Sequence, residues 1–468
     1  MSAEPRPSPD RGDAPAARGQ PPARPVAVLG GGWAGAVAAY RLSASGIPVV
    51  VHEAGSVLGG RARRVERSGL AIDNGQHLLM GAYGATLAVL RGIHQQPDAD
   101  PGLRRFRLVV APFERSPGPL LEAARLPPPW DLVGGMLRSR ALDWNERLAA
   151  VRWLRGLAKS RYARPDGETV DGLLAPLPPS VRRLLAPLSL AALNTPTERA
   201  SSAMFARILG RLAAGRGGTD FLLPLLDLSE LLPEAAARRV EARGGEVRLR
   251  STAQVAAIRD DGVDIVATEG QWTASAAIVA VGPHQLEGAF SPGVAALPGV
   301  GRAIGLTGAL GYEPTTTVWL GFRERLRLPA HIARLDDRPG HWVVDRHDVL
   351  ERSPEAAQAH ALRGFLAIVI SAGGPHDDLD AKSLFGEVHA QLRRLRPEFP
   401  TPVWSQVIAE RRATWSCVPG ATRPEAGRIA DRLYLAGDYT DPGLPATLEA
   451  AVASGERAAR ALIGDRER

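Results

Sequence analysis

The sequence predicts an α/β protein with two interleaved parts, an open parallel sheet and a mixed region of strands and helices. Three observations support this prediction. An apolar run at residues 26–29 leads through a glycine-rich turn into an Ala-rich helical pattern. A second combination of strand, glycine and acid stands near the C-terminus, at residues 433–438. Between them lie long segments whose apolar residues recur at helical spacing.

The first element, residues 25–53, reads as a βαβ unit. Its first strand is followed by Gly30, Gly32 and Gly35, which form a G-x-G-x-x-G sequence, and by a helix at 33–45. The first glycine permits a tight turn, the second lets a diphosphate approach the backbone, and the third lets the helix pack on the strand. Such turns also join ordinary strands and helices, but the flanking strands favour dinucleotide binding.

Neighbouring residues complete the expected cofactor site. Trp33 and Ala34 stand at the start of the helix, where free N–H groups attract an anion. The second strand, at 48–53, ends on Glu53, and Ala54 follows it. A carboxylate at this position accepts hydrogen bonds from ribose hydroxyls and repels a 2′-phosphate, which disfavours NADP.

A second glycine element, at residues 58–62, contains Gly60 and Arg61. Its glycines let the chain pass close to a cofactor, and the Arg61 guanidinium is expected on phosphate oxygens or on a flavin edge. The element resembles the glycine doublet of FAD-dependent amine oxidases and carotenoid desaturases, and nicotinamide-binding domains lack it. FAD is therefore the expected cofactor.

A turn at residues 73–75 follows, and Gly75, Gln76 and His77 come at its end. In this kind of fold the segment runs beneath the flavin ring, so all three residues are expected to line the flavin site. A histidine after a turn is also a common structural residue, and both roles of His77 stay open.

Residues 127–232 predict a mostly helical insert, which Asp143 or Asn145 is expected to cap at one helix start. A strand at 104–110 is expected before it. The segments with helical spacing are 145–159, 181–193, 203–214 and 222–232.

Part of the insert has the composition of a bilayer-facing surface. The same pattern also fits a helix that faces its own core. The residues concerned are Trp130, Leu132, Val133, Met136 and Leu137, with Arg138 and Arg140 close by.

After the insert, residues 235–285 return to the first sheet, with a helix, a hairpin and a further buried strand. Val255 lies where such folds run a backbone beside the adenine. Residues 286–424 predict a mixed sheet that walls a pocket. Its expected strands are 315–322, 341–345, 365–370 and 403–411, with a helix at 384–394.

The C-terminal segment returns to the cofactor. Gly437 allows a close approach, and Asp438 is expected to accept hydrogen bonds from ribityl hydroxyls or nearby amides. The helix that follows directs N–H groups around Thr447 and Leu448 at the pyrimidine end of the flavin, where they stabilise the reduced, anionic form.

Composition excludes several function classes. The net charge of +7 comes almost wholly from arginine, but zinc spacings, RNA-binding aromatic motifs and DNA-reading basic helices are missing, so we expect no nucleic acid and no metal. An anionic membrane surface is the favoured partner for a basic patch.

The single cysteine, Cys417, is expected to be a buried structural thiol. Residues 1–24 read as a disordered leader.

From residue 25 to the C-terminus the chain resembles the FAD-dependent amine oxidase and phytoene desaturase superfamily. Within it, the stretches DNGQHLLMGAY, ALNTPTERAS and DFLLPLLDLSELLPEAA resemble the squalene-associated branch, the hydroxysqualene dehydroxylases of bacterial hopanoid synthesis. The resemblance implies a Rossmann-like FAD-binding domain of the GR2 type. That domain comprises residues 25–92, 235–285 and 425–468, and the substrate domain comprises 93–234 and 286–424.

The resemblance also implies the reaction, a reduction of hydroxysqualene to squalene by hydride transfer from reduced FAD. The substrate is then a long apolar isoprenoid, and the apolar insert supplies a tunnel for it. His77 and Asp441 are candidates for the acid that protonates the leaving oxygen, and a bound water is the alternative. The expected location is the cytoplasm, with peripheral contact at the inner face of the membrane; the sequence leaves the reductant of the flavin open.

Two other readings remain. A carotenoid desaturase would run similar flavin chemistry in reverse. An amine oxidase is less favoured, because it would usually need a lysine near the flavin and only Lys159 and Lys382 occur here. A flavoprotein or lipid carrier without catalysis is the third possibility.

Overall fold

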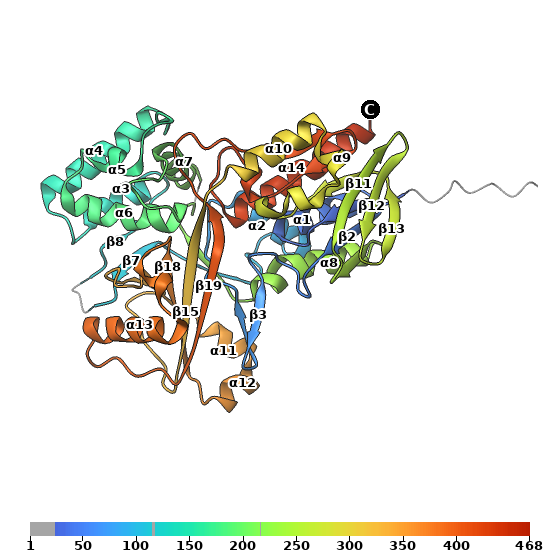
Figure 1. Ribbon diagram of the computed structural model, residues 1–468. Coiled ribbons are helices and arrows are strands. Elements are labelled where there is room, and N and C mark those ends of the chain that lie inside the picture. Colours follow the sequence, from blue (N-terminus) through green and yellow to red (C-terminus); the bar gives the residue numbers. More distant parts are fainter. Residues whose placement is uncertain (1–23, 115–117, 216) are drawn as a thin grey trace, which may run out of the picture.

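The computed structural model describes residues 24–114, 118–215 and 217–468. Residues 1–23 of the expected leader lie outside the described residues. Figure 1 shows two halves side by side: one built on the first sheet, with β11–β13 at its outer edge, and one that carries the helical insert above the long strands β15 and β19.

The first half is organised by a six-stranded sheet, with the order β10-β2-β1-β14-β21-β20. All strand pairs are parallel except β20 with β21. Val26 to Leu29 are wholly buried, as expected of a central parallel strand. The strands are β1 (Val26–Leu29), β2 (Val49–Glu53), β10 (Glu246–Leu249), β14 (Ala277–Val279), β20 (Gly427–Ala430) and β21 (Leu433–Leu435).

Helices and a small antiparallel sheet cover the six strands. Helix α1 packs against α8 and α14, and small residues permit the close crossings. A Cβ on Gly35 would lie 1.9 Å from the Gly30 oxygen, and one on Gly455 2.2 Å from the Ala34 oxygen. These elements are α1 (Trp33–Ala44), α2 (Gly84–His94), α8 (Ala235–Glu241), α14 (Leu448–Arg466), β11 (Ala253–Arg259), β12 (Gly262–Ala267) and β13 (Gly270–Ala274).

The second half contains a seven-stranded sheet, with the order β19-β15-β18-β17-β16-β7-β8. Strand β7 pairs in parallel with β16, so residues before the insert join a sheet built mainly from residues after it. Helix α13 (Ala381–Leu395) packs on this sheet. The strands are β7 (Val109–Pro112), β8 (Leu121–Glu122), β15 (Tyr312–Phe322), β16 (Ile332–Arg334), β17 (Trp342–Asp345), β18 (Gly364–Ser371) and β19 (Trp404–Trp415).

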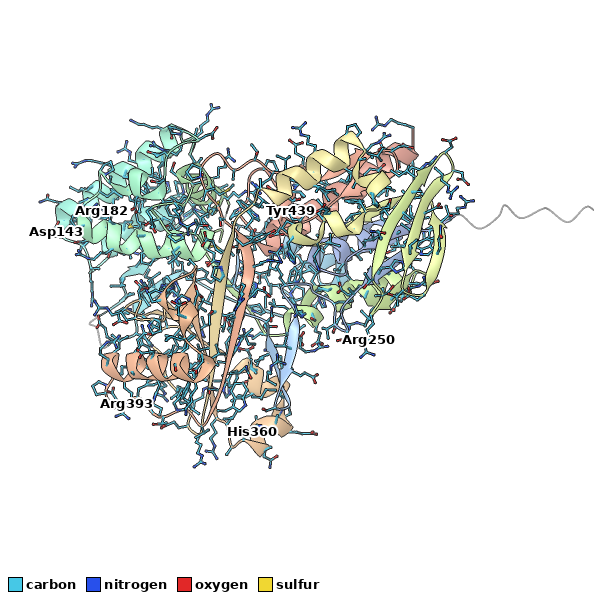
Figure 2. All side chains as sticks on the ribbon, in the orientation of Figure 1. Asp143, Arg182, Arg250, His360, Arg393 and Tyr439 are labelled. Carbon is cyan, nitrogen blue, oxygen red and sulfur yellow. The ribbon has the colours of Figure 1, made fainter. Side chains whose placement is uncertain are left out.

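The helical insert forms as predicted over most of its length. Asp143 caps α4: its side chain accepts a hydrogen bond from the Glu146 amide, and the Glu146 side chain accepts one from the Asp143 amide. Figure 2 shows Asp143 at the outer end of this insert. The helices are α3 (Trp130–Arg138), α4 (Trp144–Lys159), α5 (Val170–Leu174), α6 (Pro179–Leu193) and α7 (Ser202–Leu212).

Two expected elements are wrong. The strand expected at 104–110 is two strands in different sheets, β6 (Leu103–Phe106) and β7. The helix expected at 222–232 begins instead as a strand, β9 (Phe221–Pro224), which pairs with β6 and with β5 (Leu79–Met80). A short apolar run fits a buried helix or a buried strand equally well, and here backbone pairing on both sides of β9 decides the matter.

Further elements lie outside the two large sheets and the helical insert. They are β3 (Arg64–Arg67), β4 (Leu70–Asp73), α9 (Pro292–Ala295), α10 (Pro298–Gly308), α11 (Asp348–Arg352) and α12 (Pro354–Ala359).

Among the described residues, no helix combines the length and the apolar run that crossing a bilayer requires.

Candidate functional site

A cavity of about 2040 Å³ lies between the two halves of the molecule. One arm, the cofactor arm, is lined by both glycine elements and the start of α14. The other, the apolar arm, is lined by the helical insert and the seven-stranded sheet. The size exceeds the roughly 300–1,000 Å³ of ordinary small-molecule pockets, so the cavity has room for a dinucleotide and a second large ligand.

Most predicted site residues line this cavity. Three do not: Gly35, Val255 and Asp441. Those that do are Gly30, Gly32, Trp33, Ala34, Glu53, Ala54, Gly60, Arg61, Gly75, Gln76, His77, Gly437, Asp438, Thr447 and Leu448.

The three exceptions have clear positions. Gly35 packs α1 against β1, which is the role expected of the third glycine. Val255 is wholly buried and its backbone oxygen accepts a hydrogen bond from the Ser291 amide, while Arg250 to Ala253 of the preceding segment line the cavity instead. Asp441 is buried, pairs with Arg457 at 2.9 Å and accepts the Gly443 amide. An acid candidate held there does not face the cavity.

The two glycine elements form one cradle. The Gly59 amide donates to the Gly31 oxygen at 2.9 Å, which brings the second element alongside the first. A Cβ on Gly32 would project into the gap and approach the Gly60 Cα at 3.8 Å. No side chain caps the N-terminus of α1, so its free N–H groups face this gap. The geometry suits a diphosphate.

Glu53 is held in place by the backbone. One carboxylate oxygen accepts a hydrogen bond from the Gly31 amide and the other from the Gly55 amide, each at 2.7 Å. A carboxylate has further lone pairs, which stay available to ribose hydroxyls in the cavity.

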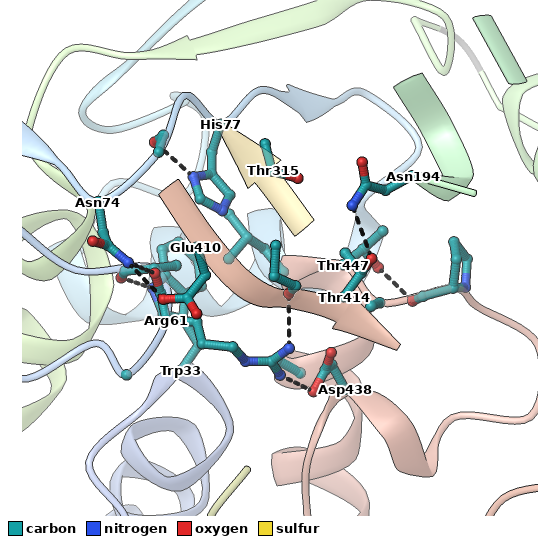
Figure 3. Close-up of a pocket in the computed structure, with 18 of the residues that line it drawn as sticks. Trp33, Arg61, Asn74, His77, Asn194, Thr315, Glu410, Thr414, Asp438 and Thr447 are labelled. Atoms are coloured by element: carbon teal, nitrogen blue, oxygen red, sulfur yellow. Dashed lines mark hydrogen bonds and ion pairs between the residues drawn. The ribbon is translucent and has the colours of Figure 1, made fainter. Parts of the chain in front are cut away.

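Arg61 and Asp438 make contacts that the sequence did not indicate. Arg61 forms an ion pair with Asp438 and donates a hydrogen bond to the Ala413 oxygen at 2.8 Å (Figure 3). The pair joins the N-terminal glycine element to the strand, glycine and acid near the C-terminus. Each of these two side chains was expected to contact the cofactor. In the structure both line the cavity, and they form an ion pair with each other.

The start of α14 organises a second helix as well as its own. Thr447 caps α14 by accepting a hydrogen bond from the Ala450 amide at 3.1 Å. Glu449, in the first turn, accepts hydrogen bonds from the Ala85 and Thr86 amides at the start of α2, at 3.0 and 2.9 Å. Sequence reasoning missed Glu449, since its partners lie far away along the chain.

His77 has a defined protonation state. Its Nδ1 lies 2.9 Å from the Gly75 oxygen; because a carbonyl only accepts, Nδ1 carries the hydrogen and Nε2 is left as an acceptor. Burial, above all, lowers the pKa of His77. The ring is therefore neutral near neutral pH, and His77 lines the cavity as an acceptor rather than an acid.

Gln76 is oriented by a buried arginine that sequence reasoning also missed. Arg346, wholly buried, donates to the Gln76 side-chain oxygen at 2.7 Å, and the Gln76 amide nitrogen donates to the His77 oxygen at 2.7 Å. Asp348 accepts two hydrogen bonds from Arg346, at 3.1 and 2.9 Å, and Asp73 lies 3.6 Å away. Arg352 lies 3.4 Å from Asp348 as well, so two arginines balance two carboxylates in this cluster.

Helix α3 fits the core-facing alternative at two of its five apolar residues. Leu132 and Met136 are 8% and 3% exposed and line the cavity, Val133 and Leu137 are half-buried, and Trp130 is 60% exposed. Leu132 and Met136 therefore form part of the wall of the apolar arm. The other apolar lining residues include Leu108, Val110, Leu121, Leu154, Leu185, Leu188, Ala192, Phe205, Ile208, Leu209, Phe221, Ile332, Trp342 and Val344.

The described residues contain no cluster of three or more His, Cys, Asp or Glu side chains suited to a metal ion. Cys417 is 1% exposed, and burial raises its pKa to about 12, so the thiol is structural.

A glycine cradle, an uncapped helix start and a fixed carboxylate fit an FAD molecule along the cofactor arm.

Comparisons with known proteins agree with this fit. The family model described as flavin containing amine oxidoreductase matches residues 33–463. A hydroxysqualene dehydroxylase of Rhodopseudomonas palustris is 30% identical over 94% of this chain and 98% of its own length. A probable zeta-carotene desaturase of Synechococcus elongatus is 22% identical over 94% of this chain and 98% of its own length.

Among solved structures, cyclohexylamine oxidase from Brevibacterium oxydans superposes with a TM-score of 0.67 over 96% of this chain and 100% of its own, at 17% identity. That likeness shows the fold. Together, the family match, the relatives and the cofactor arm show that this chain belongs to the flavin containing amine oxidoreductase family and is an FAD-dependent oxidoreductase.

Proposed function

We propose that this protein reduces hydroxysqualene to squalene, using FAD in its reduced form. The observation that carries the proposal is the cavity itself, in which a cradle for FAD is continuous with a long arm lined by Leu, Ile, Val and Phe side chains. Such an arm suits a C30 hydrocarbon and offers few partners to a polar substrate. The relative from R. palustris is named for this activity.

The proposed reaction balances with water as the second product. The allylic C–O bond breaks, the oxygen leaves with a proton as water, and a hydride forms the new C–H bond. Reduced FAD supplies the hydride when bound. An apolar arm that excludes water protects the allylic cation from hydrolysis.

Residues of this chain have distinct roles in the proposal. Those around Gly32, Glu53 and Arg61 would hold the cofactor, and the N-terminus of α14 would stabilise negative charge on it. His77 accepts a hydrogen bond from the substrate hydroxyl through Nε2 and so orients the leaving group. The proton reaches the leaving oxygen from a single bound water rather than from bulk solvent, because His77 is a neutral acceptor and Asp441 lies outside the cavity.

The proposal retains the division predicted from sequence. Residues 25–92, 235–285 and 425–468 form the part that binds FAD, and 93–234 and 286–424 form the part that binds substrate. The proposed location is the cytoplasm, with peripheral contact at the inner face of the membrane, where a C30 isoprenoid resides.

The test uses anaerobic stopped-flow mixing. Chemically reduced holoprotein is mixed with hydroxysqualene, flavin absorbance is followed near 450 nm, and the organic extract is analysed by mass spectrometry. Squalene formed in step with flavin reoxidation supports the proposal. Reduced flavin that persists, with hydroxysqualene recovered intact, contradicts it.

A carotenoid desaturase is the second candidate, and the relative from S. elongatus favours it. In that case oxidised holoprotein would bleach on mixing with a C40 polyene, and the reduced protein would leave hydroxysqualene unchanged. An amine oxidase finds no support in the cavity, since neither Lys159 nor Lys382 lines it.

A further inference from the structure

Helix α4 carries an outward stripe that pairs one aromatic ring with three cations. At 100° per residue, Trp144, Leu148, Arg152, Arg155 and Lys159 fall within about 80° of one another around the helix axis. The opposite side of α4 carries Ala150 and Leu157, at 1% and 3% exposure, which pack into the core. We call these five residues the α4 stripe.

Four of the five residues of the α4 stripe are exposed to solvent, and Leu148 is half-buried. Trp144 is 60% exposed, and Arg152, Arg155 and Lys159 are all in the exposed class. Within the part of the chain that the structure describes, these three cations form neither an ion pair nor a side-chain hydrogen bond. Most large apolar side chains are buried, so an exposed indole beside unpaired cations indicates a surface suited to a partner.

The net charge around the stripe is positive. Residues 125–161 contain eight Lys and Arg against three Asp and Glu, so most of the net charge of +7 of the whole chain falls in this hairpin of α3 and α4. Tryptophan favours the boundary between water and hydrocarbon, and Lys and Arg attract anionic headgroups. A polyanionic, partly apolar surface therefore complements it.

The same two helices wall the apolar arm from inside. Leu154 of α4 and Leu132 and Met136 of α3 line the cavity, while the α4 stripe faces outward. Figure 1 shows α4 at the outer end of the insert, away from the six-stranded sheet. A single helix layer separates the apolar arm from the proposed contact surface.

We propose that the α4 stripe docks this protein on an anionic phospholipid surface, where Trp144 enters the headgroup region and Arg152, Arg155 and Lys159 contact lipid phosphates. The docking serves substrate transfer from the bilayer into the apolar arm, and in this respect it rests on the proposed function. The site differs from the bilayer-facing alternative considered for α3, whose Leu132 and Met136 line the cavity.

The test is co-sedimentation of the FAD-loaded protein with two kinds of vesicle. One contains phosphatidylcholine alone, and the other also contains about 30 mol % phosphatidylglycerol, which is anionic. The variant R152Q/R155Q/K159Q removes the three cations. R323Q/R325Q/R327Q, on the loop after β15, removes the same charge from three other exposed arginines. W144S removes the indole.

We expect wild type to bind the anionic vesicles and to release them at high salt. The α4 variant should bind roughly 100-fold more weakly, since each cation near an anionic surface contributes about fivefold, and the loop variant should bind like wild type. W144S should weaken binding in a manner that salt does not change. Equal binding by both triple variants, or no binding by wild type, overturns the proposal.

Vesicle binding needs no substrate, so this result is separate from that of the proposed reaction. As a second readout, the α4 variant should retain turnover of detergent-dispersed hydroxysqualene and lose it with substrate embedded in vesicles. Circular dichroism and bound flavin identify any variant that is misfolded, and W144F, which keeps an aromatic ring, should restore part of the lost binding.

Discussion

At the scale of single residues, hydrogen bonds to the backbone decide what the polar groups of the cavity can do. His77 donates through Nδ1 to the Gly75 oxygen, and Glu53 accepts two backbone amides. Each side chain thereby has one fixed orientation, and each leaves specific lone pairs for a ligand. The chemistry follows from the donor and acceptor pattern more than from residue type.

The neutral state of His77 gives a pH prediction. Its pKa is lowered, chiefly by burial, so it takes a proton only below the ordinary value of about 6.5. We expect kcat/KM for hydroxysqualene to fall on the acid side, as Nε2 becomes a donor, and to stay level through neutral pH. His77→Phe should cost about tenfold, the value of one hydrogen bond.

His77→Gln keeps an acceptor and should restore part of the activity without the acid limb that belongs to His77. The measurement is the pH–rate profile of all three proteins. Activity that instead rises on acidification and is lost above neutral pH would show that His77 acts as an acid.

His341 gives a prediction for stability. Burial lowers its pKa to about 4, and its Nδ1 accepts a hydrogen bond from the Ser371 amide at 2.8 Å. Between pH 6.5 and 4 the unfolded chain binds the proton and the folded chain does not, so stability falls as pH falls through this window.

Between pH 7 and pH 5 this one group should reduce the free energy of unfolding by about 2 kcal/mol. His341→Asn keeps an acceptor for Ser371 and has no proton to gain, so its stability should decline less over the same range. Urea unfolding of both proteins at the two pH values measures the difference; parallel declines would contradict the assignment.

At the scale of elements, the site depends on contacts between helix and strand ends. The starts of α1 and α14 both face the cofactor arm, while the start of α2 is occupied by Glu449. The two glycine elements touch through Gly31 and Gly59. Element ends, where backbone groups are free, therefore form most of the cofactor arm.

Glu449 should stabilise α2 from a distance. Glu449→Ala leaves the Ala85 and Thr86 amides without their acceptor, and we expect a loss of about 2 kcal/mol in the free energy of unfolding. Glu449→Gln keeps one acceptor oxygen and should lose less. Glu467→Ala, just beyond α14 at an exposed position, is the control and should change stability little. Denaturant unfolding with bound FAD measures all three.

The ion pair between Arg61 and Asp438 should couple two distant segments. Arg61→Ala leaves a buried carboxylate beside the cofactor arm, so we expect FAD to dissociate more readily, with its Kd raised roughly tenfold. Asp438→Asn removes that charge. A double-mutant cycle on the FAD Kd, measured by fluorescence, should give a coupling of about 1–2 kcal/mol; strictly additive effects would show that the pair does not act as a unit.

At the scale of the whole molecule, two halves enclose one cavity. The six-stranded sheet presents the ends of β1, β2, β14 and β21, and the insert with the second sheet covers the opposite side. Neither half contains both arms. The reaction we propose needs this closure, since one arm holds FAD and the other a hydrocarbon.

Blocking the apolar arm should impair substrate binding without impairing FAD binding. Leu185, Leu188 and Ala192 line it from one face of α6. Ala192→Trp fills the arm, and we expect kcat/KM for hydroxysqualene to fall roughly 100-fold or more, because a bulky ring displaces several buried methylene groups. Ala242→Trp, at the exposed C-cap of α8, adds the same ring elsewhere and should have little effect.

The readouts are turnover and the Kd for FAD. Ala192→Trp should retain FAD, because the glycine elements and Glu53 that form the cradle are unchanged. Full activity of Ala192→Trp on hydroxysqualene would show that the substrate does not use this arm.

The sequence by itself determined the elements whose cause is local. The βαβ unit at 25–53 follows from an apolar run, glycines at fixed spacing and an acidic strand end. The start of α4 was also predicted locally, with Asp143 or Asn145 as its cap, and the structure assigns the cap to Asp143. The strand, glycine and acid at 433–438 were equally readable. Each depends on neighbours within one or two turns of chain, so composition and spacing suffice to predict them.

Only the tertiary structure decided the contacts between segments far apart in the chain. Local spacing made 222–232 a helix, but pairing with β5 and β6 makes its start a strand. It left α3 open between a bilayer surface and a helix that faces the core, and the structure places Leu132 and Met136 at the cavity. It gave no sign that Arg346 orients Gln76, or that Glu449 caps α2. Burial and hydrogen bonding join residues through space, and periodicity along the chain carries no record of which distant segment completes them.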